Sequence, residues 1–218
     1  MVADTEAYEK NRAKNKKSPT EKENWPKGGW HAIRKAANDF IKRNRFAIHN
    51  GDPSLKKLYL YQTYIVLRLF SEIPFRNGFA DFHLTDVSGK NYVSVPKKGS
   101  IQFVVREHKN VKSMGEKKIK VSRGGTTQLR KFLKFRAEVV DNKNDHFLNT
   151  LKGTKMTRSA LGKMLQRTLR KLLNKNIGSR LIRVLAATEN RDSIEKVSKL
   201  SDSLLHTTKQ SKEYVRKD

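Results

Sequence analysis

The sequence predicts a mainly α-helical protein with one small antiparallel β-sheet. Apolar residues recur at helical spacing in long segments before residue 74 and after residue 125. Between these segments lie short runs rich in β-branched and aromatic residues, which are typical of strands. The length of 218 residues suits one large domain, or one domain preceded by an arm.

The first part of the chain divides into an arm and two helices. Residues 1–24 are polar and charged, so we expect them to form a disordered arm before a domain spanning 25–218. Residues 31–47 place apolar side chains at helical spacing. Residues 55–73 are apolar nearly all round, which predicts a buried helix that Pro74 ends.

The middle of the chain predicts the sheet. Residues 91–95 (NYVSV) and 101–105 (IQFVV) are β-rich runs separated by PKKGS. A third run, IKV at 119–121, follows a turn signal at Met114 and Gly115. We therefore expect a small antiparallel sheet here.

Helices return after the sheet. We expect them at 126–140, 157–175 and 179–189, followed by two short ones at 193–205 and 207–216. The helix at 157–175 has an apolar face, and its basic residues lie largely elsewhere on the wheel: Arg158, Lys163, Arg167, Arg170, Lys171 and Lys175. Such a basic flank suits a phosphate backbone, although an ordinary solvated helix face has the same pattern.

Composition narrows the possible partners. The chain has 48 Lys and Arg against 21 Asp and Glu, a net charge of +27, which implies a polyanionic partner. Nucleic acid is the first candidate and an anionic membrane surface the second. No apolar run approaches about 18 residues, and the N-terminus lacks an apolar signal core, so we expect neither a transmembrane helix nor secretion.

Cysteine and histidine usage limits the chemistry. Without cysteine there is no disulfide, thiolate zinc site or cysteine nucleophile, and the six histidines are scattered without metal-ligand spacing. We therefore expect no metal and no cofactor.

Breaking a DNA strand without a metal needs a nucleophile, donors for the transition-state charge and a proton for the leaving oxygen. Arg, Lys, His and Tyr can supply these groups.

Four segments, in order, resemble the tyrosine recombinases, the phage-integrase type of site-specific recombinase. PFRNGFADFHL (74–84) is similar to their first-arginine motif, and VVREHKNVKSMGEKKIKV (104–121) to their β-hairpin, whose turn brings a lysine to the active site. IGSRLIRVLAATE (177–189) resembles the motif written His-x-x-Arg, and KLSDSLLHTTKQSKEYV (199–215) resembles the C-terminal box. PTEKENW, at the start of the similar region 19–216, resembles the lead-in of integrase-like members from eukaryotic DNA viruses and mobile elements.

The resemblance implies roles for particular residues. Arg76 and Arg183 match the arginines that clamp the scissile phosphate. Lys109 matches the hairpin lysine that protonates the leaving 5′ oxygen, and Lys112 in the same turn is the alternative. We also expect duplex contacts from the hairpin, including Lys112, and from the basic flank of 157–175.

The remaining matches lie in the third and fourth segments. His206 matches the histidine that hydrogen-bonds the phosphate, and Tyr214 matches the nucleophile. Arg180 stands where the motif has histidine, and it cannot serve as a base near neutral pH because the guanidinium pKa is above about 12. Activation of Tyr214 would then fall to His206, water or the surroundings of the phosphate. The spacing from His206 to Tyr214 is eight residues, one shorter than in many members.

The resemblance implies the catalytic-domain fold of a tyrosine recombinase acting on duplex DNA. Tyr214 would form a 3′-phosphotyrosyl bond and release a 5′ hydroxyl without ATP or metal, and four protomers would assemble at a synapse. The location would be intracellular and DNA-associated: the nucleus or a viral replication compartment if the origin is a eukaryotic virus. Residues 1–24 are too few for the helical core-binding domain that precedes most members' catalytic domains, which leaves either a truncated or a minimal protein.

Three other readings stay open. A type IB topoisomerase uses the same chemistry with similar residues. A noncatalytic DNA- or RNA-binding relative would have kept the fold, and Arg180 favours it. A basic ribosome- or membrane-associated protein would leave the four ordered segments unexplained.

Overall fold

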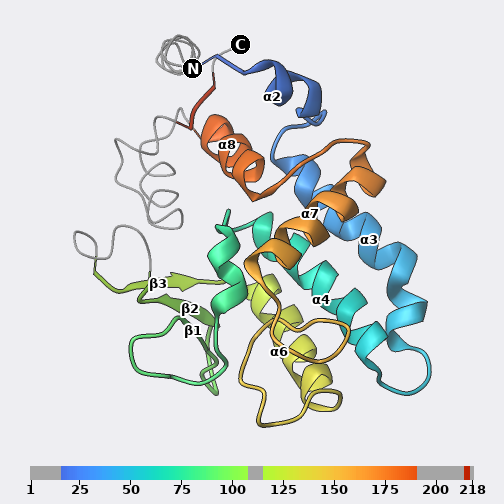
Figure 1. Ribbon diagram of the computed structural model, residues 1–218, viewed down its shortest axis with the longest axis vertical. Coiled ribbons are helices and arrows are strands. Elements are labelled where there is room, and N and C mark those ends of the chain that lie inside the picture. The colour runs from blue at the N-terminus through green and yellow to red at the C-terminus, as the bar shows by residue number, and fades with distance from the viewer. Residues whose placement is uncertain (1–15, 108–114, 191–213, 217–218) are drawn as a thin grey trace.

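A helical body with a small sheet at one side makes up the protein (Figure 1). The computed structural model describes residues 16–107, 115–190 and 214–216. Its elements, in order, are α2 (Pro19–Asn24), α3 (His31–His49), α4 (Leu55–Phe70), the 3₁₀ helix η1 (Asn77–Asp81), β1 (Tyr92–Ser94), β2 (Gln102–Val105), β3 (Lys117–Lys120), α6 (Arg123–Ala137), α7 (Arg158–Leu173) and α8 (Ser179–Glu189). The predicted fold class, mainly α with a small antiparallel sheet, is confirmed.

Part of the expected disordered arm is folded. Helix α2 begins with a capping box, in which the Ser18 hydroxyl accepts from the Glu21 N–H and the Glu21 carboxylate accepts from the Ser18 N–H. Pro19 occupies the first helical position, where its missing N–H costs nothing. The prediction of disorder is therefore wrong for residues 19–24, because these local start signals outweigh the polar composition.

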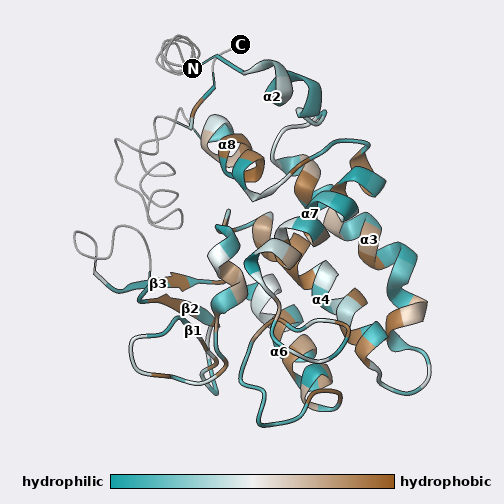
Figure 2. Ribbon diagram, viewed as in Figure 1, coloured by the Kyte–Doolittle hydropathy of each residue, from teal (hydrophilic) through white to brown (hydrophobic). Residues whose placement is uncertain are grey.

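Helix α4 is the centre of the helical body. Ser54 caps it, its side chains are buried almost all round as predicted, and it ends at Phe70, three residues before the predicted end. Helix α3 packs along it through Ile33, Ala36 and Ala37, whose side chains are buried. Figure 2 shows bands of hydrophobic and hydrophilic residues alternating along α7 and α8, as expected for helices with one buried face.

The sheet is an antiparallel meander in the order β1-β2-β3. Val93 pairs with Phe103, and Phe103 pairs with Ile119, so these three buried side chains share the face that packs on the core. Lys118 and Lys120 flank Ile119 and are exposed, as the two-residue period of a strand requires. One face of the sheet is therefore apolar, and on the other face the strand β3 carries Lys118 and Lys120.

The C-terminal helices match prediction closely. Helix α8 has the predicted bounds, and α7 ends at Leu173, two residues before the predicted end, where Asn174 caps it in the left-handed conformation common after a helix. The helix predicted at 193–205 and most of that at 207–216 lie outside the described residues. Residues 214–216 are described, and they form a turn and irregular chain, so the helix prediction is wrong for them. In the described part of the chain, no helix is long and apolar enough to cross a membrane.

We predict that Gly125→Ala destabilises the protein by about 1–3 kcal/mol, because an added Cβ would overpack the core. That Cβ would lie 2.6 Å from Val121 Cγ1, and Val121 is buried. Gly124→Ala in the same helical turn is the control, since its Cβ would lie 3.4 Å from a guanidinium nitrogen of Arg68 and alanine favours helix. Urea unfolding of both variants tests this, and equal stability of the two would contradict it.

Candidate active site

Arg76 is held in place by the aromatic core on both sides of it. Phe75 and Phe79 are buried and stacked, with ring centroids 4.5 Å apart, and each packs against Phe103 of β2. The Phe79 N–H donates to the Arg76 carbonyl oxygen, which starts η1. The backbone at Arg76 is therefore fixed by a packed core, while its side chain is only half-buried.

Close packing of η1 on α7 depends on Gly162. A Cβ at this position would lie 3.1 Å from Asn77 Nδ2, a tighter contact than side chains usually make. The glycine lets the segment that follows Arg76 approach α7, which links the first-arginine segment to the helix with the basic flank.

Arg183 is a buried guanidinium on the first turns of α8. Its exposed fraction is 9%, and its Nε lies buried without a hydrogen-bond partner among the residues that the structure describes. Burial lowers the pKa of Arg183, and the positive charges of Arg76 and Arg180 lower it further. No ion pair neutralises Arg183 among the described residues. A buried cation that has an N–H without an acceptor, and that lies near other cations, is an environment that favours a bound anion.

Tyr214 lies against Arg183. The Arg183 guanidinium carbon is 5.7 Å from the centre of the Tyr214 ring, within the range of a cation–π contact. A hydrogen bond with Tyr214 also raises the pKa of Arg183, against the effect of burial. The ring is half-buried and packs with Trp30 and Val215 on Ala186 and Ala187 of α8.

The structure thus brings together four of the predicted catalytic residues. Arg76, Arg180 and Arg183 are close enough for their charges to interact, and Tyr214 contacts Arg183. Arg76 lies more than a hundred residues before the other three in the sequence. The other three predicted groups, Lys109, Lys112 and His206, lie outside the described residues. The catalytic role of each residue remains a prediction.

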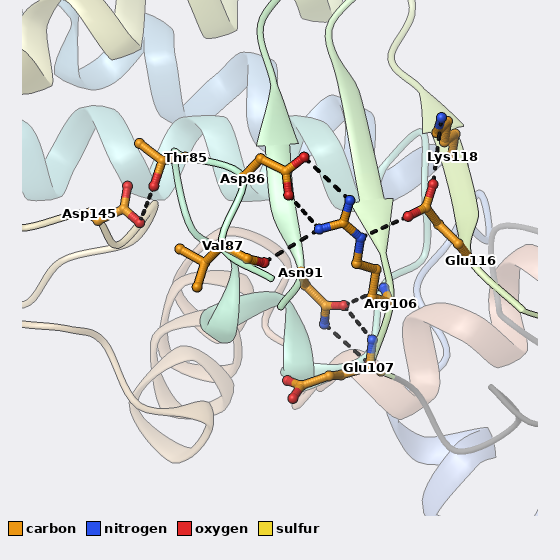
Figure 3. A network of polar contacts seen from close by, with 9 residues as sticks. All are labelled: Thr85, Asp86, Val87, Asn91, Arg106, Glu107, Glu116, Lys118 and Asp145. Atoms are coloured by element: carbon orange, nitrogen blue, oxygen red, sulfur yellow. Dashed lines mark hydrogen bonds and ion pairs between the residues drawn. The ribbon is translucent and has the colours of Figure 1, made fainter. Parts of the chain in front are cut away.

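A polar network braces the base of the hairpin that carries Lys109 and Lys112 in the sequence (Figure 3). Arg106 forms ion pairs with Asp86 and, at 2.7 Å, with Glu116. The Asn91 side-chain oxygen accepts from the N–H groups of Arg106 and Glu107, each at 2.7 Å. Hydrogen bonds from Arg106 lower the pKa of the Asp86 and Glu116 carboxyls and raise that of Arg106. The residues just before and just after 108–114 are therefore tied together.

Sequence reasoning missed this network, although a signal was present. Arg106 follows the strand IQFVV, and Glu116 precedes the next strand, so opposite charges flank the hairpin turn. Such cross-strand pairs stabilise antiparallel sheets. Asp86 and Asn91 had no comparable signal, because they lie in a loop whose path is set by the fold.

The basic flank of α7 forms as predicted, with one departure. Its exposed cations that make no ion pair within the described residues are Lys163, Arg167, Arg170 and Lys171. Arg158 instead pairs with Asp81 of η1, which also contacts Lys155 at 3.2 Å. The charge of Arg158 is therefore partly neutralised, and Arg158 is a weaker candidate for binding phosphate than the other four.

No group of three or more His, Cys, Asp or Glu side chains gathers as metal ligands would, over the ranges that the structure describes. The convergent chemistry of the site is that of arginine and tyrosine.

Solved structures share this fold. XerA recombinase matches with a TM-score of 0.61 at 13% sequence identity, over 86% of this chain and 57% of that one. XerH site-specific recombinase, bound to palindromic difH substrate in a post-cleavage complex, matches with a TM-score of 0.59 at 16% identity, over 85% and 48%. Its pre-cleavage complex with difH substrate gives 0.58 at 14% identity, over 84% and 48%.

These likenesses show that the chain has the fold of a recombinase catalytic domain, and that it spans about half the length of these neighbours. No protein-family model matches the chain, and no curated protein matches it.

We predict that Asn91→Ala costs about 1–3 kcal/mol of stability, because it removes two part-buried hydrogen bonds that the backbone N–H groups of Arg106 and Glu107 donate. Amide hydrogen exchange should become faster at Arg106 and Glu107. Asn142→Ala is the control, since Asn142 is exposed. Urea unfolding and exchange measurements test this, and unchanged exchange at both amides would rule out the bracing role.

Proposed function

We propose that this chain cuts and rejoins duplex DNA through a covalent 3′-phosphotyrosyl bond, as the catalytic domain of a tyrosine recombinase. The observation that carries the proposal is the contact of Tyr214 with the buried Arg183, beside the charges of Arg76 and Arg180. The fold also supports the proposal. The four sequence segments occur in the order found in tyrosine recombinases, and a solved recombinase structure shares the fold of this chain.

The proposed step is a transesterification. The Tyr214 hydroxyl oxygen attacks the phosphorus and forms a P–O bond, while the bond from phosphorus to the 5′ oxygen breaks. The tyrosine hydroxyl loses its proton, and a proton reaches the 5′ oxygen, which leaves as a free hydroxyl. Attack by a 5′ hydroxyl on the phosphotyrosine reverses the step. The bond to tyrosine is itself a phosphodiester, so the energy of the broken bond is kept and rejoining needs no ATP.

The arginines would stabilise the charge that builds on the phosphate in the transition state. A guanidinium can donate two parallel hydrogen bonds to phosphate oxygens, and a preformed donor needs no rearrangement during the reaction. Arg183 fits this role because its burial is maintained by α8 and its Nε has no partner in the described residues. Arg180 would add hydrogen bonds and charge but not act as a base.

Proton transfer is assigned to groups outside the described residues. Lys109 is the proposed general acid, with Lys112 as the alternative, and the braced base at Arg106 supports the hairpin that carries them. His206 is proposed to hydrogen-bond the phosphate. These assignments follow the sequence resemblance.

The exposed cations of α7, together with the hairpin, are proposed to contact the phosphate backbone of duplex DNA. Their charge is available because four of them make no ion pair among the described residues. Strand exchange between two duplexes requires four protomers, so we propose a tetramer on DNA. An intracellular, DNA-associated location follows from this function, and the likeness to viral and mobile-element integrases remains a proposal.

A noncatalytic DNA-binding relative is the second candidate, and Arg180 is the observation that favours it, because the motif position usually holds a group able to accept a proton. A type IB topoisomerase would form the same covalent bond and is separated by assaying supercoil relaxation against strand exchange.

We predict that Arg183→Ala lowers the rate of covalent adduct formation by about 10²–10³, through loss of a preformed donor. Arg183→Lys keeps the positive charge but cannot donate two parallel hydrogen bonds to a phosphate, so this variant should also form the adduct slowly. Adduct formation is followed on nicked suicide duplexes, with Arg43→Ala as the exposed control. Wild-type rates in both Arg183 variants would reject the assignment.

We predict that Tyr214→Phe abolishes the adduct and leaves noncovalent duplex binding unchanged. The ring that packs on Ala186 and Ala187 is retained, and only the hydroxyl oxygen is lost. Tyr64→Phe is the control, because Tyr64 is buried in α4. Denaturing gels detect the adduct, and an adduct formed by Tyr214→Phe would place the nucleophile elsewhere.

A further inference from the structure

The residue two positions after Tyr214 is tied to the N-terminal helix. Arg216 Nε donates to Glu21 Oε2 at 2.9 Å, and a terminal guanidinium nitrogen donates to Glu21 Oε1 at 3.1 Å. The exposed fractions of the two side chains are only 8% and 14%. This is a two-pronged, largely buried ion pair between residues 195 positions apart in the chain.

Two further contacts hold the same segment on α8. The Arg216 N–H donates to the Thr188 hydroxyl at 3.0 Å. Val215 and Tyr214 pack with Trp30 on Ala186 and Ala187. Figure 1 shows the segment in red, running between α8 and α2.

Glu21 is suited to hold a cation. Burial raises the pKa of its carboxyl. Hydrogen bonds from Arg216 and from the Ser18 N–H lower this pKa, and so do the charges of Arg216 and Arg180. Together these effects place the pKa of Glu21 below its ordinary value. The ion pair therefore forms fully at pH values above the usual pKa of a carboxyl group, and it is lost only as the pH falls through the lowered pKa of Glu21. At neutral pH the carboxylate is charged.

The ion pair restricts where Tyr214 can be. Two residues span at most about 7 Å of extended chain, so fixing Arg216 confines the Tyr214 backbone to a small volume beside α8. Arg183 lies on that helix and contacts the ring. The reach of a tyrosine hydroxyl toward a phosphate clamped by Arg183 therefore depends on the anchor at Arg216.

We propose that Glu21 and Arg216 are positioning residues, whose ion pair holds Tyr214 against Arg183 of the same protomer. The proposal rests on the proposed function for its catalytic consequence, but the docking itself can be measured without DNA. Neither residue belongs to the four segments that resemble the recombinases' catalytic motifs, and neither touches the reacting atoms.

Variants can separate this role from the folding of α2. Glu21→Gln removes the charge but keeps a side chain able to accept from the Ser18 N–H, so the capping box survives. Arg216→Gln removes the other partner, and the double variant combines the two. Glu23→Gln is the matched control, because Glu23 is an exposed glutamate of the same helix.

The first readout is docking. Trp30 packs in the cluster that holds Tyr214, so ¹⁹F NMR of protein labelled with 5-fluorotryptophan reports the docked segment, with Trp25→Phe assigning the two signals. Glu21→Gln, Arg216→Gln and the double variant should shift the Trp30 signal alike, and Glu23→Gln should leave it in place.

The second readout is the adduct rate on nicked duplexes. A nucleophile misplaced by about 1 Å can lose about 10²-fold in rate, so we expect each single variant to slow by about that factor, with duplex affinity unchanged. The double variant should be no slower than either single variant, because both remove one interaction.

The outcomes are distinguishable. Slow single variants with a shifted Trp30 signal and no additional loss in the double variant support the proposal. Wild-type rates in both single variants overturn it and leave the proposed function standing. Additive losses also overturn it, since the residues would then act separately. If the wild-type protein forms no adduct, the proposed function fails, and the Trp30 signal alone decides whether the pair docks Tyr214.

Discussion

A buried arginine beside other arginines is the arrangement on which the site depends. Arg183 is largely removed from water, and Arg76 and Arg180 add repulsion. Burying an uncompensated charge is expensive, so a fold that maintains it needs a rigid scaffold and gains when an anion binds. Tyr214 supplies part of the compensation through its ring and hydroxyl. A phosphate between the arginines would supply the rest, and this is the reason for our proposal that the chain cleaves DNA strands.

The scaffold accounts for how distant segments meet. The stacked Phe75 and Phe79 hold Arg76 against the sheet, and Gly162 lets η1 settle on α7. Helix α8 follows α7 after a short connection and presents Arg183. Arg216 contacts α8 through Thr188 and α2 through Glu21, so residues 214–216 connect these two helices. In the proposed arrangement, the salt bridge between Glu21 and Arg216 holds the nucleophile in place.

The sequence predicts the local structure well where periodicity is strong. The amphipathic pattern of 179–189 predicted the bounds of α8. The structure places Arg76, Arg180, Arg183 and Tyr214 near one another, and their catalytic roles stay predictions. Composition misled at residues 19–24, where a capping box begins a helix in a charged stretch. The pair of Glu21 and Arg216 had no sequence signal, because its two members are far apart and each sits among many other charges. The roles expected for Lys109, Lys112 and His206 stay predictions, because these residues lie outside the described ranges.

Identifying the residue that becomes joined to DNA tests whether Tyr214 is the nucleophile. The wild-type protein is incubated with a pool of nicked duplexes of randomised sequence, in which loss of the short strand makes cleavage irreversible. The covalent complex is digested, and the DNA-linked peptide is sequenced by mass spectrometry. We expect a phosphodiester link between Tyr214 and the 3′ side of the break. A link at any other residue, a 5′ link, or no covalent complex at all would contradict it.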